Sequence, residues 1–196
     1  MSNWDILLLD TSGSMVMNRD DLIDGFNHLV AEQKKLKPDG LFTVSTFSST
    51  VQLFKEDTFS NFTEVTGDDF ILAGTTALYD AVGCAYDMIL KNDYKNVTLT
   101  VITDGSENSS ILYNIDSLNN KRESVGKKCT LNMTFIGTDI SCITEAPVAG
   151  HARQSFDTQG DIYNAFRLAS REISRDGAEW HELNIRRERS SRTYSR

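Results

Sequence analysis

Two aspartates in this chain each stand at the end of an apolar, strand-like run. Asp10 ends the run Trp4–Asp10 (WDILLLD), and Asp104 ends the run Val97–Asp104 (VTLTVITD). In an open α/β sheet, ligands bind beyond the carboxyl ends of the strands, where the strand order reverses. Two carboxylates placed side by side there would repel and desolvate each other unless a cation lay between them. The two aspartates therefore predict a cation site.

Hydroxyl side chains accompany the first aspartate. Ser12 and Ser14 follow Asp10 at alternate positions in the loop DTSGSM, residues 10–15. Carboxylate and hydroxyl oxygens are hard ligands, which suit Mg²⁺, Mn²⁺ or Ca²⁺ rather than zinc. We therefore expect a hard divalent cation, with Mg²⁺ as the first choice. The other explanation is that Asp10 and Asp104 only cap loops and helix N-termini, with no metal.

Three sequence elements resemble the metal-ion-dependent adhesion site (MIDAS) of von Willebrand factor A-type (vWA) domains. Residues 10–14 (DTSGS) are similar to the D-x-S-x-S element of that family. Residues 73–80 (AGTTALYD) resemble its G-G-T-x-L-Y-D element, with Ala73 where the family often has glycine, and residues 103–108 (TDGSEN) resemble T-D-G-x-x-N. The resemblance spans about residues 3–175 in the right order. It implies a Rossmann-like vWA fold in a short, intracellular, bacterial or phage-like form.

The resemblance also implies a set of metal ligands. Ser12 and Ser14 would bind the metal directly, Thr75 directly or through water, and Asp10 and Asp104 mainly through water. An open sixth position would take a Glu or Asp carboxylate of a partner protein. Three neutral hydroxyls and two carboxylates cannot overcompensate a divalent ion, so the ion would still attract a third carboxylate.

Several other polar residues are expected to have structural roles. Asp80 is predicted to be a helix-surface or capping carboxylate rather than a sixth ligand, and Glu107 to be a charge at the rim of the site. The histidines His28, His151 and His181 are isolated in the sequence, and we interpret them as structural or surface residues.

The segments that must position these residues alternate between strand-like and helical patterns. Further apolar runs at Leu41–Phe47 and Leu131–Asp139 are typical of strands buried on both faces. The run Val51–Thr58 follows Leu41–Phe47 so closely that only an antiparallel hairpin of these two strands fits. Helical periodicity predicts helices at about 20–37, 78–89 and 161–175, and a weaker polar helix at about 110–125. The prediction is an α/β, three-layer fold: a mostly parallel sheet of about six strands, one antiparallel edge strand, and helices on both faces.

Length and composition fit one domain at residues 1–177, followed by a polar, arginine-rich tail at 178–196. The net charge of −8 disfavours binding to nucleic acid or anionic membranes. No apolar run approaches the roughly 20 residues of a membrane span, and the start does not resemble a secretory signal. The three cysteines Cys84, Cys129 and Cys142 are expected to be reduced thiols, so we predict a cytoplasmic protein.

These features predict a metal-dependent protein-interaction module that is not an enzyme. The main alternative is a structural or accessory subunit of a larger assembly (ATPase-linked, phage or stress-response) in which the metal only stabilises the fold. A haloacid-dehalogenase-like phosphatase would need a second acid two residues after Asp10, where this chain has Ser12. The motifs G-x-S-x-G, G-x-x-x-x-G-K-[ST] and G-x-G-x-x-G are absent from the sequence, which disfavours a serine hydrolase and a nucleotide-binding protein.

Overall fold

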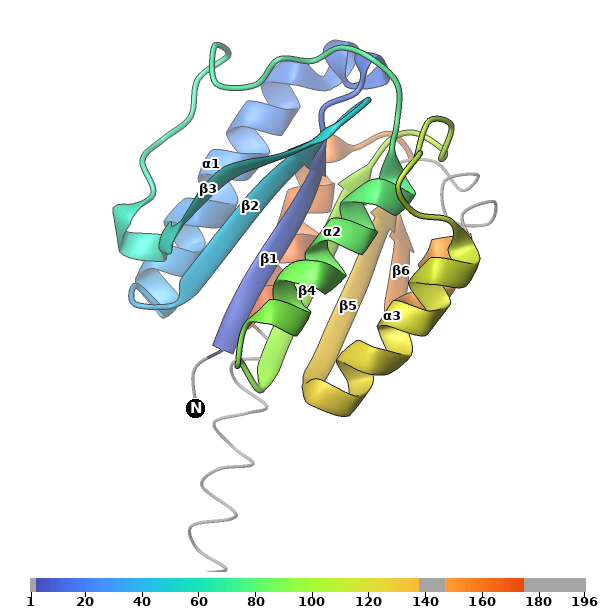
Figure 1. Cartoon of the computed structure of the whole chain (residues 1–196). Coiled ribbons are helices and arrows are strands. Elements are labelled where there is room, and N and C mark those ends of the chain that lie inside the picture. Colours follow the sequence, from blue (N-terminus) through green and yellow to red (C-terminus); the bar gives the residue numbers. More distant parts are fainter. Residues whose placement is uncertain (1–2, 138–146, 175–196) are drawn as a thin grey trace, which may run out of the picture.

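A six-stranded sheet forms the centre of the computed structural model, which describes residues 3–137 and 147–174. Its strands are β1 (Asn3–Asp10), β2 (Leu41–Phe47), β3 (Val51–Thr58), β4 (Asn96–Thr103), β5 (Thr130–Gly137) and β6 (Gln154–Asp157). The strand order is β3-β2-β1-β4-β5-β6, and every neighbouring pair is parallel except β2 and β3 (Figure 1). The order reverses between β1 and β4. The predicted mostly parallel sheet with one antiparallel edge strand is confirmed.

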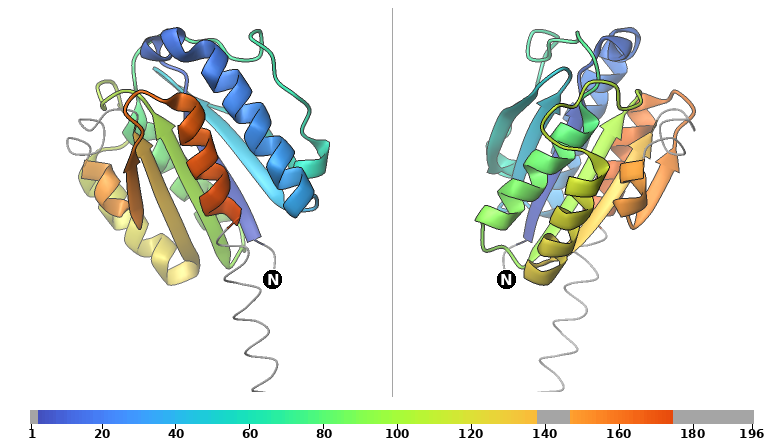
Figure 2. Two further views of the ribbon diagram at one scale, coloured as in Figure 1. Left: turned by 180° about the vertical axis from the view of Figure 1, so that it is seen from behind. Right: turned by 45° about the vertical axis from the view of Figure 1, so that its right-hand side comes forward.

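Helices cover both faces of this sheet. They are α1 (Arg19–Leu36), α2 (Leu78–Lys91), α3 (Ile115–Lys128) and a C-terminal helix over residues 162–174. Helices α2 and α3 lie on one face, whereas α1 and the C-terminal helix lie on the other (Figures 1 and 2). Three short 3₁₀ helices complete the described secondary structure: η1 (Gly13–Asn18), η2 (Phe59–Asn61) and η3 (Pro147–His151). The three-layer α/β prediction is therefore confirmed.

Local sequence signals explain where α1 begins and ends. Acidic Asp20 and Asp21 lie in its first turn and basic Lys34 and Lys35 in its last, which complements the helix dipole. The backbone N–H of Lys37 donates to the carbonyl of Gln33 at 2.8 Å, and Pro38 follows. Proline cannot continue the helix, because it lacks an N–H and its ring clashes with the preceding turn.

The polar helix expected at about 110–125 is shifted along the chain. Helix α3 begins at Ile115 and ends at Lys128, with a capping box formed by Asn114 and Ser117. The preceding residues form a loop instead, because the carboxylate of Asp80 binds their backbone N–H groups. A distant contact thus overrides the local helical pattern.

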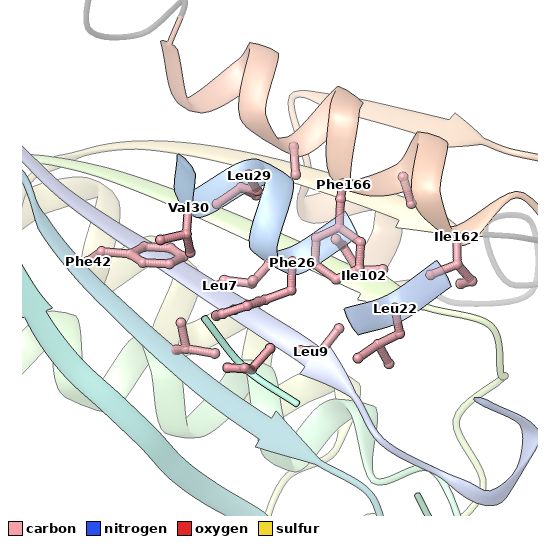
Figure 3. Packing of buried hydrophobic residues seen from close by; sticks show 14 of the residues in the cluster. Leu7, Leu9, Leu22, Phe26, Leu29, Val30, Phe42, Ile102, Ile162 and Phe166 are labelled. Carbon is pink, nitrogen blue, oxygen red and sulfur yellow. The ribbon is translucent and has the colours of Figure 1, made fainter. Parts of the chain in front are cut away.

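Two apolar clusters lie on opposite faces of the sheet. Side chains of β1 alternate between them: Ile6 and Leu8 face α2 and α3, whereas Leu7 and Leu9 face α1 and the C-terminal helix. In the second cluster, Phe26 and Phe166 pack edge to face with ring centroids 6.3 Å apart (Figure 3). This two-sided burial explains the continuous apolar run in β1, because both faces of the strand are covered by helices.

Some predictions fall on residues outside the described part of the chain: the tail at 178–196, Cys142 and His181. Within the described part, Cys84 and Cys129 are free thiols. His28 is partly exposed beside Glu32, whereas His151 is buried. Among the described helices, none has the length and apolar character that a membrane crossing requires.

Candidate metal centre

Three loops meet at the carboxyl edge of the sheet, one after β1, one before α2 and one after β4. Backbone hydrogen bonds join the first two, because Gly13 N–H donates to the carbonyl of Gly74 at 3.0 Å and Ala73 N–H donates to that of Thr11 at 3.0 Å. The third loop is joined to the second by Asn108 N–H, which donates to the carbonyl of Thr76 at 3.1 Å. The five candidate ligands are therefore carried by one connected loop assembly.

Asp10 occupies the innermost position of this edge. Its side chain is fully buried, and its Oδ1 accepts the N–H of Ser12 at 2.7 Å. Its Oδ2 accepts the hydroxyl of Thr103 at 2.5 Å, from the adjacent end of β4. Burial raises the pKa of Asp10 to about 6, and the nearby Asp104 charge adds to the rise. The buried charge of Asp10 is thus only partly stabilised by its own hydrogen bonds.

A chain of hydroxyls runs outward beside Asp10. The Oγ atoms of Ser12 and Ser14 are 3.0 Å apart, and the Ser14 hydroxyl donates to Oδ1 of Asp104 at 2.5 Å. Ser12 is buried and Ser14 is exposed, so the chain leads from the interior to the surface. Burial also raises the pKa of Asp104, against its hydrogen bond from Ser14. Four of the five candidate ligands therefore lie together.

Thr75, the fifth candidate ligand, is exposed and binds a residue that the sequence analysis missed. Its Oγ1 is 2.8 Å from the Oγ of Ser49, and its backbone N–H donates to that same Oγ at 3.0 Å. Gly74 makes this approach possible, because its φ of +87° favours glycine and an added Cβ would lie 2.6 Å from Ser49 Oγ. In the sequence, the run of hydroxyl residues Ser48-Ser49-Thr50 between β2 and β3 is the feature that could have indicated this contact.

The oxygen atoms of this cluster fit a hard divalent cation. Neighbouring oxygens of an octahedral Mg²⁺ site, each about 2.0–2.1 Å from the ion, lie about 3 Å apart. The Ser12–Ser14 separation of 3.0 Å matches that spacing. Both carboxylates have raised pKa values, so their anionic forms would gain from a nearby cation. Within residues 3–137 and 147–174, no group of three or more His, Cys, Asp or Glu side chains could hold a metal ion. Any site here therefore depends on the hydroxyls.

Asp80 and Glu107 support the loops. Asp80 is 4% exposed and accepts the backbone N–H groups of residues 111, 112 and 113 at 2.9–3.0 Å. Glu107 accepts the N–H of Tyr79 at the start of α2, and those of Ser109 and Ser110 in its own loop. Asp80 is thus a buried carboxylate that binds the loop before α3, whereas a helix-surface or capping role was predicted, and Glu107 is the carboxylate that binds the start of α2.

Several solved structures have a similar fold. A von Willebrand factor type A protein from Catenulispora acidiphila matches with a TM-score of 0.59 and 16% identity, over 86% of this chain and 42% of that one. The fold is that of a vWA domain. The pilus adhesin SpaC from Lactobacillus rhamnosus GG, in its open conformation, matches with a TM-score of 0.62 and 12% identity, over 90% of this chain and 30% of that one. Proximal thread matrix protein 1 from the mussel byssus, with a zinc-occupied MIDAS motif, matches with a TM-score of 0.54 and 12% identity, over 89% of this chain and 48% of that one.

The similarity is one of fold, and this vWA-like chain covers less than half the length of each of those three proteins. No protein-family profile matches its sequence. No curated protein sequence matches it either. The resemblance identified from residues 10–14, 73–80 and 103–108 is therefore confirmed at the level of the fold.

Proposed function

We propose that this vWA-like chain is a non-catalytic, metal-dependent protein-interaction module. In this proposal Asp10, Ser12, Ser14, Thr75 and Asp104 hold a divalent cation, with Mg²⁺ as the first choice and Mn²⁺ or Ca²⁺ as alternatives. The cation would supply a Lewis-acidic point that accepts an Asp or Glu carboxylate of a partner protein. The observation that carries the proposal is the continuous oxygen chain from Ser12 through Ser14 to Asp104 at the reversal of strand order.

The charges of the proposed ligands favour an acidic partner group. Three of the five are neutral hydroxyls, and the two carboxylates at most balance a divalent ion. Asp10 is fixed by Ser12 N–H and by the Thr103 hydroxyl, so its position needs no rearrangement of the sheet. Ser14 is exposed, which leaves the outer side of the site accessible to another molecule.

Exposed apolar side chains in the same loops support a protein as the partner. Val16 and Met17 follow Ser14 in η1, Ile71 lies in the loop that carries Thr75, and Ile111 and Leu112 lie in the loop between β4 and α3. Met17, Ile71 and Ile111 are 90%, 83% and 88% exposed. Exposed apolar side chains on the loops that carry a site can be buried by a protein that binds there, which is favourable. A similar fold occurs in a pilus adhesin, and another carries zinc in a MIDAS motif.

A thermal titration tests the metal part of this proposal. A ligand that binds only the native state, at about 100 times its Kd, stabilises the protein by about 2.7 kcal/mol. For a domain of this size that is a rise in Tm of roughly 5–10 °C. We expect Mg²⁺ or Mn²⁺ to produce such a rise, and Asp10→Ala to abolish it. No rise with either ion would overturn the proposal.

Capture of protein partners tests the second part. The immobilised chain is incubated with host extract in Mg²⁺ and, in parallel, in EDTA, with Asp10→Ala as a matched control. We expect specific capture only by the wild-type chain in Mg²⁺. If capture is equal in EDTA, the metal only stabilises the fold, and the accessory-subunit alternative replaces the interaction proposal.

The free thiols of Cys84 and Cys129 are compatible with the reducing cytoplasm, where we propose that the protein acts.

A further inference from the structure

A cavity of about 300 Å³ opens beside the candidate metal centre. It lies between the β2–β3 hairpin and the segment 69–73, on the face of the sheet that carries α1. Its lining includes Thr11, which stands between Asp10 and Ser12, and Ala73, which precedes Thr75 by two residues. The cavity and the candidate metal centre therefore share the same two loops. Its volume is at the lower limit of ligand sites, which suits one side chain.

Polar side chains without partners line this cavity. Thr46, Thr50 and Gln52 make no side-chain hydrogen bond to any part of the chain that the structure describes. Thr46 is half-buried on β2, and Gln52 pairs with it in register across the hairpin from β3. Thr50 and Gln52 are exposed to solvent, so their hydroxyl and amide groups are available to a ligand with hydrogen-bonding capacity.

Asp69 is the sole charged residue among those that line the cavity. Its Oδ2 accepts the backbone N–H of Thr66 at 2.7 Å and the hydroxyl of Thr66 at 2.9 Å. These bonds lower the pKa of Asp69, so its carboxylate is ionised at neutral pH. The cavity wall also includes the aromatic rings of Phe54 and Phe70, whose centroids are 5.0 Å apart.

We propose that this cavity binds an arginine side chain of the same partner whose carboxylate the metal would hold. A guanidinium has five N–H donors and no acceptor, which matches the hydroxyl, amide and carboxylate oxygens of Thr46, Gln52 and Asp69. Its planar face and alkyl stem are suited to the aromatic wall. The tail at 178–196 carries five Arg and three Glu, so residues 1–177 have a net charge of −10. This charge and the carboxylate of Asp69 disfavour an anionic group in the cavity. The identity of the partner rests on the proposed function, whereas the arginine site does not.

An NMR titration of the full chain tests the arginine site without metal. The probes are Nα-acetylarginine amide and its neutral isostere Nα-acetylcitrulline amide, both added in EDTA. We expect the arginine probe to shift the backbone amide signals of Thr11, Thr46, Gln52 and Phe70. The citrulline probe is expected to bind about two- to fivefold more weakly, because it lacks the charge. Equal shifts with both probes, or shifts scattered over the surface, would overturn the proposal.

A pair of neighbouring variants tests whether the carboxylate of Asp69 causes the preference for arginine. Asp69→Asn keeps an oxygen for the Thr66 N–H and removes the carboxylate charge, whereas Asp68→Asn makes the same change one residue outside the cavity. We expect the preference for arginine over citrulline to vanish in Asp69→Asn and to persist in Asp68→Asn. If Asp69→Asn disturbs its loop, the comparison of the two probes on the wild-type chain still shows whether the cavity prefers arginine to citrulline.

A linked peptide separates this inference from the proposed function. Ac-Glu-Gly-Gly-Arg-NH₂ and the same peptide with citrulline in place of arginine are titrated with and without Mg²⁺. If arginine improves binding but Mg²⁺ has no effect, the cavity assignment holds and the metal-dependent function fails. If Mg²⁺ improves binding but arginine and citrulline are equivalent, the metal-dependent function holds and the cavity assignment fails.

Discussion

The hydroxyl of Ser14 donates to Oδ1 of Asp104 at 2.5 Å, although the two residues are 90 positions apart in the chain. This contact joins the loop after β1 to the loop after β4. It is possible because β1 and β4 are parallel neighbours, so that both loops leave the sheet at the same edge. Ser14 and Asp104 are therefore hydrogen-bonded to each other, and in the proposed site both would also bind the metal.

Ser14→Ala should remove most of the Mg²⁺ response with little effect on the fold. The side chain is exposed but donates to the Asp104 carboxylate, so the free energy of unfolding in EDTA should fall by about 1 kcal/mol. The loss of one oxygen ligand should reduce the rise in Tm that Mg²⁺ produces. Thermal unfolding with and without Mg²⁺ measures both quantities. Ser124→Ala on the exposed surface of α3 is the control, and an unchanged Mg²⁺ response in Ser14→Ala would exclude Ser14 as a ligand.

Asp10→Asn should stabilise the metal-free protein and abolish its response to metal. The amide keeps an oxygen for the N–H of Ser12 and can donate to the hydroxyl of Thr103, whereas the buried charge is lost. The raised pKa of Asp10, about 6, indicates that this charge is unfavourable near pH 7 in the absence of a cation. We expect a rise in Tm of at least about 2 °C in EDTA at pH 7.5. A lower Tm in EDTA would mean that the Asp10 charge already has a sufficient partner within the fold.

The central part of the site could be predicted from the sequence because it depends on strand ends. Asp10 and Asp104 end apolar runs, and parallel strands bring their carboxyl ends to one edge whatever the details of the loops. The hydroxyls of Ser12 and Ser14 are local to Asp10. Four of the five candidate ligands were therefore predictable as one cluster.

The remaining features depend on contacts between distant loops, which local patterns do not encode. Ser49 meets Thr75 across 26 residues, and their approach needs the left-handed conformation of Gly74. The loop before α3 is kept from forming helix by the buried carboxylate of Asp80. Strand β6, with four residues, is too short for a periodic pattern to be recognised.

His151 should make the stability of the protein depend on pH below neutrality. Its Nδ1 lies 3.1 Å from the hydroxyl of Tyr86 and its Nε2 lies 2.7 Å from Oδ1 of Asn119, an arrangement that suits the neutral ring. Burial and the nearby Arg122 lower its pKa. The unfolded chain therefore binds a proton more readily than the folded one, so stability is retained above about pH 6.5 and is lost as the pH falls below it.

Chemical denaturation between pH 5 and pH 7.5 measures this dependence. We expect the loss of stability at low pH to be smaller in His151→Gln than in the wild type. The raised pKa of Asp10 has the opposite effect over this range and is common to both proteins. A wild-type slope that persists in His151→Gln would assign the pH dependence to other groups. The measurement is made in EDTA, so that metal binding does not contribute.

Two glycine substitutions should have opposite effects on stability, because the two sites differ in the space beside the helix. In Gly25→Ala the new Cβ would lie 2.5 Å from the ring of Phe166, in the contact between α1 and the C-terminal helix (Figure 3). Overpacking of this kind costs about 1–3 kcal/mol. In Gly126→Ala, on α3, the new Cβ meets no atom within 4 Å. Alanine is the better helix former by about 0.5–1 kcal/mol, so this variant should be more stable than the wild type.

The pair of glycine variants also tests whether the C-terminal helix packs on α1 in solution. Urea unfolding of both variants in the same buffer gives the two free-energy changes with opposite expected signs. Gly126→Ala controls for the general effect of alanine on helix propensity, since it shares that effect without the steric conflict. If Gly25→Ala were stabilised as much as Gly126→Ala, Phe166 would not lie against Gly25. That result would contradict the close packing of α1 against the C-terminal helix on this face of the sheet.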